Sequence, residues 1–485
     1  MLSDKTFFFS WSMARAKAFS SLSGDWNPIH TDRAYARRTR YGHLIAHGID
    51  LLLAALEQVI PSTANTGLSE LVEVHIRFTA PLISQGVITV ETESVDDDRV
   101  SIRILHDRTL LQHGHFKTQP RSGKTLEPYS NSYPFKQADN SERESELKYL
   151  SGIIPWRLDA TLATELYPTL SKWLSNSQIA AFVVTSQCVG MRAPGARATL
   201  VSAHINFDSF VPQKQDCAFK VTRFDERYNI LFGVLSGPGF TAKTQALLQP
   251  APVKQDTMAQ LSGRVPSAAF SGATVWVLGG SRGLGETVVK LTASGGAKVY
   301  FTYFLGKKDA KQICDDVGSR GGKCEALQLD LQAPLAIIRQ QFKKLPKPTL
   351  VVNCATPSIQ PSHPYNWSGK LFSEYLEFYV GGTSKIAQLL TAMFSGSPAS
   401  IKLLIPSSKF IDDPPARFAE YTAAKVVGEI AVKALNSKNS LLHGMFVRLP
   451  PLITDQTVGL PKHELVNPAD AMLPVLMGLV PLGQI

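Results

Sequence analysis

Hydrophobic positions along the chain follow two different patterns, which divide it near residue 260. In the first part, short segments alternate apolar and polar residues with the period of two that half-buried strands show; these segments are 71–78, 86–95, 99–106 and 110–117. In the second part, short apolar segments such as 273–278 alternate with longer, helix-length ones. The pattern predicts an antiparallel sheet followed by a parallel α/β sheet.

One segment of the first part, Ile49–Leu56, is apolar on nearly every side and therefore predicts a buried helix. The first N–H groups of a helix have no partner within it, so the donors at His47 and Gly48 should point into the interior.

Asp25, Asn27 and His30 precede this helix on a segment that we expect to be a fixed, non-helical loop, because Gly24 comes before it and Pro28 favours an extended Asn27. An acid and an imidazole beside a helix N-terminus suit the addition of water to an α,β-unsaturated thioester, or its removal. The alternative interpretation is a plain turn with a structural histidine.

A weak repeat covers the first 250 residues. VHIRF at 74–78 returns as AHINF at 203–207, and VDDDRV at 95–100 as FDERYN at 224–229, each 129 residues later. The second copy, with a helix expected near 161–182, has neither the Asp/His loop nor Ala46-His47-Gly48, so we expect it to be catalytically empty. Segments 118–146 and 249–266 have the composition of linkers.

The second part begins with a strand, 273–278, that runs into Gly279-Gly280-Ser281-Arg282-Gly283-Leu284-Gly285 and a helix through Leu291. A glycine turn between a strand and a helix N-terminus can hold a pyrophosphate. Further strands are expected at 298–304, 325–330, 349–355, 401–408 and 445–449, which together predict a doubly wound parallel sheet.

Ser408, Tyr421 and Lys425 form the second group of candidate catalytic residues. Tyr421 and Lys425 are one helical turn apart in YTAAK and share a face. A cationic Lys425 should lower the pKa of the Tyr421 phenol, which could then exchange a proton with a carbinol oxygen that Ser408 binds.

Both parts resemble known families. LSGDWNPIHTD and YGHLIAHGI are similar to the MaoC-like (R)-specific enoyl-thioester hydratases, and the repeat looks like their double hot-dog form. GGSRGLG, NCA, Ser408 and YTAAK resemble the short-chain dehydrogenase/reductase family. The resemblance implies an α+β double hot-dog followed by an α/β Rossmann-type doubly wound parallel sheet, with domains at 1–125, 140–250 and 265–485.

The resemblances also imply roles for single residues. The resemblances imply catalytic roles for Asp25 and His30 in the first part, with a supporting or oxyanion role for Asn27 and Gly48. In the second part they imply catalytic roles for Ser408, Tyr421 and Lys425. The residues expected to bind the cofactor are Gly279, Ser281, Arg282, Gly283, Leu284, Gly285, Asp330, Asn353, Ala355, Tyr421, Lys425 and Thr454.

The second part departs from its family in several places. Leu278 stands where Thr is usual, Thr356 ends the NNAG-like motif, and Pro450-Pro451 replaces proline-glycine. Tyr379 aligns with the asparagine that commonly completes the proton relay. These departures leave open a slow or degenerate reductase half.

Charge informs the choice of ligand. The net charge is +10, but the basic residues are scattered, so we expect no nucleic-acid partner and instead an anionic acyl-CoA or acyl-carrier protein thioester. The second strand of the parallel sheet ends in 303–308 without an acid, and Arg282 lies in the glycine loop, so NADP(H) is the expected cofactor.

Length and composition limit the number of domains and the cellular location that we expect. A chain of 485 residues should hold about three domains. Five cysteines without metal-ligand spacing predict no metal site and a reducing, cytoplasmic location. No apolar run is long enough to predict a membrane span. Both families tend to oligomerise, so a homo-oligomer, dimer or larger, is expected by analogy.

The two parts share an intermediate. We expect a bifunctional 3-oxoacyl-thioester reductase and (R)-3-hydroxyacyl-thioester dehydratase. One alternative is the reverse, degradative sequence, in which an enoyl-CoA is hydrated and the alcohol oxidised. A second alternative is a non-catalytic acyl-binding scaffold.

Overall fold

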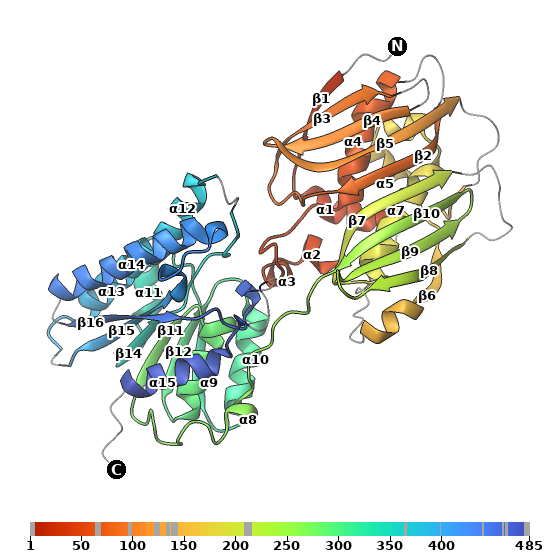
Figure 1. Cartoon of the computed structure of the whole chain (residues 1–485). Helices are drawn as coiled ribbons and strands as arrows, with labels where there is room; N and C mark the ends of the chain where they lie inside the picture. The colour runs from red at the N-terminus through yellow and green to blue at the C-terminus, as the bar shows by residue number, and fades with distance from the viewer. Residues whose placement is uncertain are drawn as a thin grey trace. The chain divides into compact units, whose positions relative to one another are not determined.

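The computed structural model folds into two compact units, residues 1–251 and 252–485 (Figure 1). It describes residues 5–479 apart from 64–68, 96–98, 121–126, 132–135, 137–143, 208–215, 363–365, 398, 439–440, 458–459 and 461–463.

The first unit contains a ten-stranded antiparallel sheet in the order β1-β3-β4-β5-β2-β7-β10-β9-β8-β6. Its strands are β1 Lys5–Trp11, β2 Ser69–Phe78, β3 Gly86–Ser94, β4 Arg99–His106, β5 Thr109–Pro120, β6 Ser151–Pro155, β7 Ala198–Phe207, β8 Asp216–Asp225, β9 Ile230–Gly237 and β10 Phe240–Leu248. The four strands expected at 71–117 are confirmed, whereas β1 and β6 had not been predicted.

The strand order repeats. β1-β3-β4-β5-β2 in the first half corresponds to β6-β8-β9-β10-β7 in the second, and the halves join where β2 pairs antiparallel with β7. The repeated segments 74–78 and 203–207 lie on these two joining strands, with His75 directly opposite His204. The sequence repeat therefore corresponds to a structural repeat, although residues 96–98 of its second match lie outside the described residues.

Two long helices lie against one face of this sheet: α4 Gly48–Thr63 and α7 Asn176–Met191 (Figure 1). The predicted helix at 49–56 is confirmed as part of α4. The prediction of one helix at 161–182 was wrong, because the segment forms α5 Ala160–Leu166, α6 Leu170–Trp173 and the start of α7. Pro168 disfavours a helical Tyr167 before it, and Ser175 caps a new helix.

The Asp/His segment lies between α1 Arg15–Ser23 and α3 Arg33–Ala36. The prediction that it is wholly non-helical was wrong, because Pro28–Thr31 forms one helical turn, α2. Pro28 occupies the first helical position, where its missing N–H has no consequence, and the Asn27 side chain accepts a hydrogen bond from the Ile29 N–H.

The second unit is a six-stranded, all-parallel sheet in the order β13-β12-β11-β14-β15-β16, which confirms the predicted parallel sheet. Its strands are β11 Thr274–Leu278, β12 Lys298–Tyr303, β13 Lys323–Gln328, β14 Leu350–Asn353, β15 Ile401–Ser408 and β16 Leu442–Leu449. Its α-helices are α8 Met258–Leu261, α9 Gly283–Ser294, α10 Lys307–Gly318, α11 Leu335–Phe342, α12 Gly369–Leu376, α13 Thr383–Phe394, α14 Ala419–Lys438 and α15 Pro468–Leu479.

Both faces of the parallel sheet are buried. On β11, Val275 and Val277 belong to one hydrophobic cluster, while Trp276 and Leu278 belong to another on the opposite face. A strand buried on both sides explains why 273–278 is apolar throughout.

The two predicted linkers differ in how far the structure describes them. Segment 118–146 falls largely outside the described residues, and β5 includes its first three positions. Segment 249–266 contains the short helix α8, which Thr257 and Gln260 begin with a reciprocal capping box. Within the described residues, no helix combines the length and apolarity that crossing a membrane requires.

Candidate functional sites

The first site begins where α1 ends. Gly24 has a φ of 71°, a left-handed conformation that stops the helix, and donates its N–H to the Ser20 carbonyl. The Ser23 hydroxyl then accepts the N–H of Asp25 at 3.1 Å. These bonds place Asp25 in the interior, where its side chain is almost wholly buried.

His30 lies in α2 and is fixed by one strong hydrogen bond. Its Nδ1 is 2.8 Å from the carbonyl oxygen of Ile45. Because only a ring N–H can donate to a carbonyl, neutral His30 carries its proton on Nδ1 and keeps a lone pair on Nε2. His30 is therefore prepared to accept a proton.

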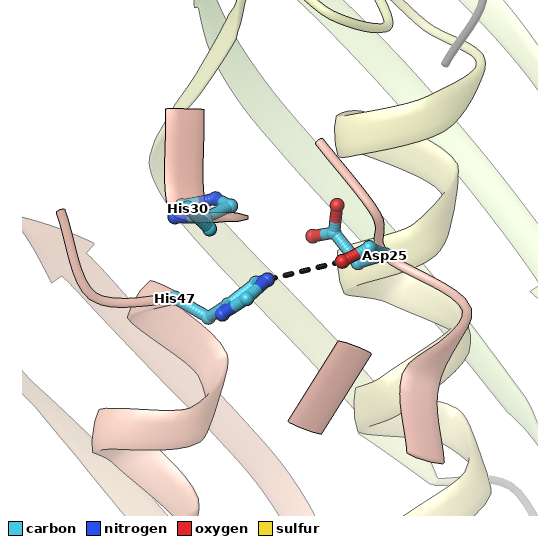
Figure 2. Close-up of side chains that lie close together, drawn as sticks. All are labelled: Asp25, His30 and His47. Atoms are coloured by element: carbon cyan, nitrogen blue, oxygen red, sulfur yellow. Dashed lines mark hydrogen bonds between the residues drawn. The ribbon is translucent and has the colours of Figure 1, made fainter. Parts of the chain in front are cut away.

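The His47 side chain joins Asp25 and His30, as Figure 2 shows. Its Nε2 donates to the backbone oxygen of Asp25 at 3.1 Å, and its ring stacks on that of His30 with centroids 3.8 Å apart. Polar atoms of the three side chains lie within 4.8 Å of one another. Each imidazole donates one N–H to a backbone carbonyl and keeps a lone pair on its other ring nitrogen. The expectation of no metal stays a prediction.

A cavity of ≈ 300 Å³ brings the four predicted residues together: Asp25, Asn27, His30 and Gly48 all line it. Gly48 begins α4, so its N–H has no acceptor within the helix. The side chain of Asn27 has a structural role, because it caps α2 and donates to the Gly195 carbonyl between α7 and β7. The remaining wall is largely apolar and includes Ile49, Leu51, Phe78, Leu82, Val189 and Leu200.

Burial dominates the electrostatics of this site. It raises the pKa of Asp25, although nearby His30 and two hydrogen bonds oppose the shift. It lowers the pKa of His30 against the attraction of Asp25, and it holds the pKa of His47 well below its usual range. His30 and His47 are thus neutral at neutral pH.

Two residues that line this cavity were not predicted from the sequence. Ser186, on α7 of the second half, donates its hydroxyl to Asp25 Oδ2 at 2.6 Å. Gln112, on β5, donates to the Gly48 carbonyl at 2.8 Å. No motif marked either position. The pairing of β2 with β7, which brings α7 to the site, could have been anticipated only from the repeat.

The second site is built on the glycine loop between β11 and α9. Gly279 has a φ of 76°, and a Cβ there would lie 2.9 Å from the backbone of Ala355. A Cβ at Gly285 would lie 2.1 Å from the Gly279 carbonyl oxygen. Only glycine permits this close backbone approach at the N-terminus of a helix, a cradle that fits the pyrophosphate of a dinucleotide.

The other predicted cofactor residues gather around this loop or at nearby strand ends. Asn353 ends β14 and accepts the Ala355 N–H, and the Thr454 side chain lies 3.5 Å from the position of a Cβ on Gly283. Asp330 follows β13 and is exposed. The remaining members, Ser281, Arg282 and Leu284, belong to the loop and the first turn of α9. Arg282 forms an ion pair with Asp455 at 3.7 Å, which the sequence did not predict.

The structure brings Ser408, Tyr421 and Lys425 together at the end of β15. Ser408 is the last residue of that strand, and its side chain hydrogen-bonds Tyr421 on α14. Lys425 Nζ donates to the Pro406 carbonyl at 2.9 Å and lies 5.7 Å from the centre of the Tyr421 ring.

The expectation that Lys425 lowers the pKa of Tyr421 does not hold in this structure. Burial raises the pKa of Tyr421 to about 12, opposed by the Ser408 hydrogen bond, while burial lowers the pKa of Lys425 to about 8. Desolvation outweighs attraction because the ammonium is directed toward Pro406 and the Tyr379 ring.

Two family matches coincide with these two sites. Residues 9–112 match the family described as MaoC like domain, and residues 273–440 match the family described as short chain dehydrogenase. The first range holds Asp25, Asn27, His30 and Gly48, and the second holds the glycine loop with Ser408, Tyr421 and Lys425. These matches imply a hot-dog fold for the first range and a Rossmann-like fold for the second.

Comparisons with individual proteins gave shorter or more distant likenesses. The chain is 45% identical over 51 residues to a cyclic-di-GMP-binding biofilm dispersal mediator protein of Escherichia coli K12, which is 10% of this chain and 22% of that protein. A short-chain dehydrogenase from Shigella flexneri matches 45% of this chain and 89% of its own, with 18% identity and a TM-score of 0.41.

Another solved structure, a short-chain dehydrogenase from Shigella flexneri 2a strain 301 complexed with NADP, matches 44% of this chain and 93% of its own, with 18% identity and a TM-score of 0.40. Together, the two family matches and the two sites show that this chain joins a MaoC-like dehydratase domain to a short-chain dehydrogenase domain.

Proposed function

We propose that the chain is a bifunctional enzyme that reduces a 3-oxoacyl thioester with NADPH and removes water from the resulting (R)-3-hydroxyacyl thioester. The observation that carries this proposal is the convergence of Asp25 and His30 in one largely apolar cavity at the N-terminus of α4. The retained Ser408, Tyr421 and Lys425 of the second unit support the reductase step.

In the dehydratase site, the thioester carbonyl binds near the Gly48 N–H, where the helix terminus stabilises negative charge that develops on the oxygen. His30 Nε2 and the Asp25 carboxyl handle the two proton transfers: one group takes the proton next to the carbonyl, and the other returns a proton to the departing hydroxyl. His30 suits the role of base because it is neutral and its Nδ1 proton is held by Ile45.

In the reductase site, a bound nicotinamide dinucleotide supplies the hydride. Tyr421 retains its proton at neutral pH and donates it to the carbonyl oxygen of the substrate, which Ser408 also binds. Lys425 places a positive charge beside Tyr421 and favours the developing oxyanion.

NADP(H) is the proposed cofactor because β12 is followed by Phe304, Leu305 and Gly306, none of which repels a 2′-phosphate, and then by Lys307 and Lys308 at the start of α10. Arg282 favours NADP(H) less than the sequence indicated, because its side chain forms an ion pair with Asp455. Lys307 and Lys308 are therefore the main reason to prefer NADP(H) over NAD(H).

For the first unit we propose a double hot-dog built from domains 1–125 and 140–250, with the reductase domain at 265–485. The repeated strand order supports the pairing of two like halves around a single catalytic centre. All five cysteines are free, which supports a reducing compartment such as the cytoplasm. The carrier, CoA or carrier protein, and a homo-oligomeric state stay predictions.

A two-substrate assay tests the proposal. Crotonyl-CoA should lose its enoyl absorbance as it is hydrated, and acetoacetyl-CoA should consume NADPH. Asp25→Asn should abolish hydration and leave reduction intact, while Tyr421→Phe should do the reverse. Absence of both activities in the wild-type chain would favour the scaffold alternative, and faster oxidation of 3-hydroxyacyl-CoA by NAD+ than reduction by NADPH would favour the degradative direction.

A further inference from the structure

The carboxylate of Asp25 is held by α7, a helix of the repeat whose sequence lacks the Asp/His loop. Ser186 on α7 donates its hydroxyl to Asp25 Oδ2 at 2.6 Å, and both side chains are more than nine-tenths buried. The bond joins residues 161 positions apart in the chain. A hydrogen bond to a buried carboxylate is short and strong because it offsets lost hydration.

A second residue of α7 shapes the same contact. Gly190 is one helical turn after Ser186, and a Cβ built on it would lie 2.1 Å from Asp25 Oδ1. That oxygen also accepts the backbone N–H of Asn27 at 3.2 Å. α7 thus donates a hydroxyl to one oxygen of the Asp25 carboxylate and, at Gly190, leaves room for the other. The orientation of this carboxylate therefore depends on the second half of the unit.

We propose that Ser186 is a positioning residue that holds the Asp25 carboxyl in its reactive orientation and, in the hydration direction, in the charged form that accepts a proton from water. This inference rests on the dehydratase function proposed above. A donated hydrogen bond stabilises the ionised carboxylate, whereas burial favours the protonated one. The hydroxyl therefore limits how far burial raises the pKa of Asp25.

Ser186→Ala tests this role through the pH profile of crotonyl-CoA hydration. Loss of the donor should raise the pKa of Asp25, move the acidic limb of kcat/KM upward by about one pH unit, and reduce kcat by roughly tenfold. KM should change little, because Ser186 acts on Asp25 and not on the acyl chain. Ser186→Thr keeps a hydroxyl and should retain most of the activity.

Ser177→Ala is the matched control, since it makes the same change on α7 about 13 Å away along the helix. The unfolding transition of the first unit, which NADPH should not shift, reports whether that unit is folded in each variant. A wild-type pH profile and kcat in Ser186→Ala would overturn the inference while leaving the dehydratase proposal standing. Absence of hydration by the wild type would instead overturn the proposed function.

Two cysteines of the second unit lie close enough to react with each other. Cys314 on α10 and Cys324 on β13 have sulfur atoms 3.5 Å apart, and both side chains are partly exposed. The Cys324 thiol donates a hydrogen bond to Cys314, which lowers the pKa of the Cys314 thiol. Cys188 and Cys217, by contrast, are buried and their thiols have raised pKa values.

We infer that this pair is a modification site at which a peroxide forms an intramolecular disulfide. The Cys314 thiolate attacks one peroxide oxygen, the O–O bond breaks, and hydroxide leaves. Cys324 then attacks the resulting sulfenic sulfur, forming the S–S bond and releasing water. The two thiols lose two electrons and two protons, and hydrogen peroxide is reduced to two molecules of water.

Peroxide treatment of the whole chain, followed by alkylation, digestion and mass spectrometry, tests the pair. A cross-linked peptide of 314 and 324 that dithiothreitol releases is expected, with Cys188 and Cys217 still alkylated after denaturation. Cys314→Ser and Cys324→Ser should each abolish the cross-link. Full alkylation of both cysteines after oxidation, or their conversion to sulfinic acids without a cross-link, would overturn the inference.

Discussion

The ammonium nitrogen of Lys425 lies 3.8 Å from the centre of the Tyr379 ring, and the Tyr379 hydroxyl is 2.6 Å from that of Thr356. Tyr379 and Thr356 are both departures from the pattern of the dehydrogenase family, and they contact each other. A ring beneath a buried cation stabilises its charge. Tyr379, although it departs from the family pattern, therefore stabilises the charged form of Lys425.

We expect Tyr379→Leu to reduce kcat for ketone reduction by roughly thirtyfold, since a desolvated cation–π contact contributes about 2 kcal/mol. Tyr379→Phe keeps the ring and loses only the bond to Thr356, so its kcat should stay within about twofold of the wild type. Steady-state reduction of acetoacetyl-CoA with saturating NADPH measures both. Equal losses in the two variants would show that the hydroxyl, and not the ring, is what matters.

The pH dependence of reduction should follow Lys425. Burial lowers its pKa to about 8, so the ammonium loses its proton as the pH rises through that value, and the positive charge beside Tyr421 disappears. Reduction should be fastest below about pH 8 and fall above it. Tyr421, whose pKa is raised to about 12, keeps its proton throughout this range.

A profile of kcat from about pH 6 to about pH 10 measures this effect. Lys425→Arg retains the charge at every pH and should remove the basic limb, although its planar guanidinium will bind less well. A rate that is constant up to about pH 10 in the wild type would contradict the assignment.

Dinucleotide binding should depend on the backbone approach at Gly285. In Gly285→Ala the new Cβ would lie 2.1 Å from the Gly279 carbonyl oxygen, so the loop must move away from the start of α9. We expect NADPH affinity, followed by fluorescence titration, to fall by more than about tenfold. Gly318→Ala is the control, because a Cβ there meets no atom within 4 Å. Unchanged affinity in Gly285→Ala would place the pyrophosphate elsewhere.

Sequence patterns predicted the parts of the fold that depend on local chemistry. The apolar helix beginning at Gly48 and the glycine loop of β11 and α9 are each encoded in a continuous segment of chain. The four predicted dehydratase residues also share one cavity, because three of them, Asp25, Asn27 and His30, lie within six positions.

Contacts between distant segments were not predictable in the same way. Ser186 reaches Asp25 only because the two halves pair through β2 and β7, a register that no local pattern specifies. The ion pair of Arg282 with Asp455 likewise depends on tertiary packing. The helical turn at Pro28 could have been predicted, since proline is favoured at the first position of a helix.

Asp50 is a fully buried carboxylate in the first turn of α4. It accepts hydrogen bonds from Trp11 at 3.0 Å, Arg15 at 2.9 Å and Tyr167 at 2.6 Å. The network therefore joins the start of the central helix to both halves of the unit. Removing the carboxylate would leave the largely buried Arg15 guanidinium without its counter-charge.

We expect Asp50→Leu to destabilise the first unit by about 3 kcal/mol, the lower end for a broken buried ion pair, because Arg15 keeps some contact with water. Tyr167→Phe removes one bond to the same carboxylate and should cost about 1.5 kcal/mol. In a unit of this size these losses correspond to roughly 6–12 °C and 3–6 °C in melting temperature.

Thermal unfolding of the whole chain with and without NADPH separates the two units, because bound cofactor should raise only the transition of the dehydrogenase unit. The other transition belongs to the first unit, and Asp50→Leu should lower it while leaving the cofactor-dependent one in place. A smaller shift in Asp50→Leu than in Tyr167→Phe would mean that the tyrosine, and not the carboxylate, is the centre of the network.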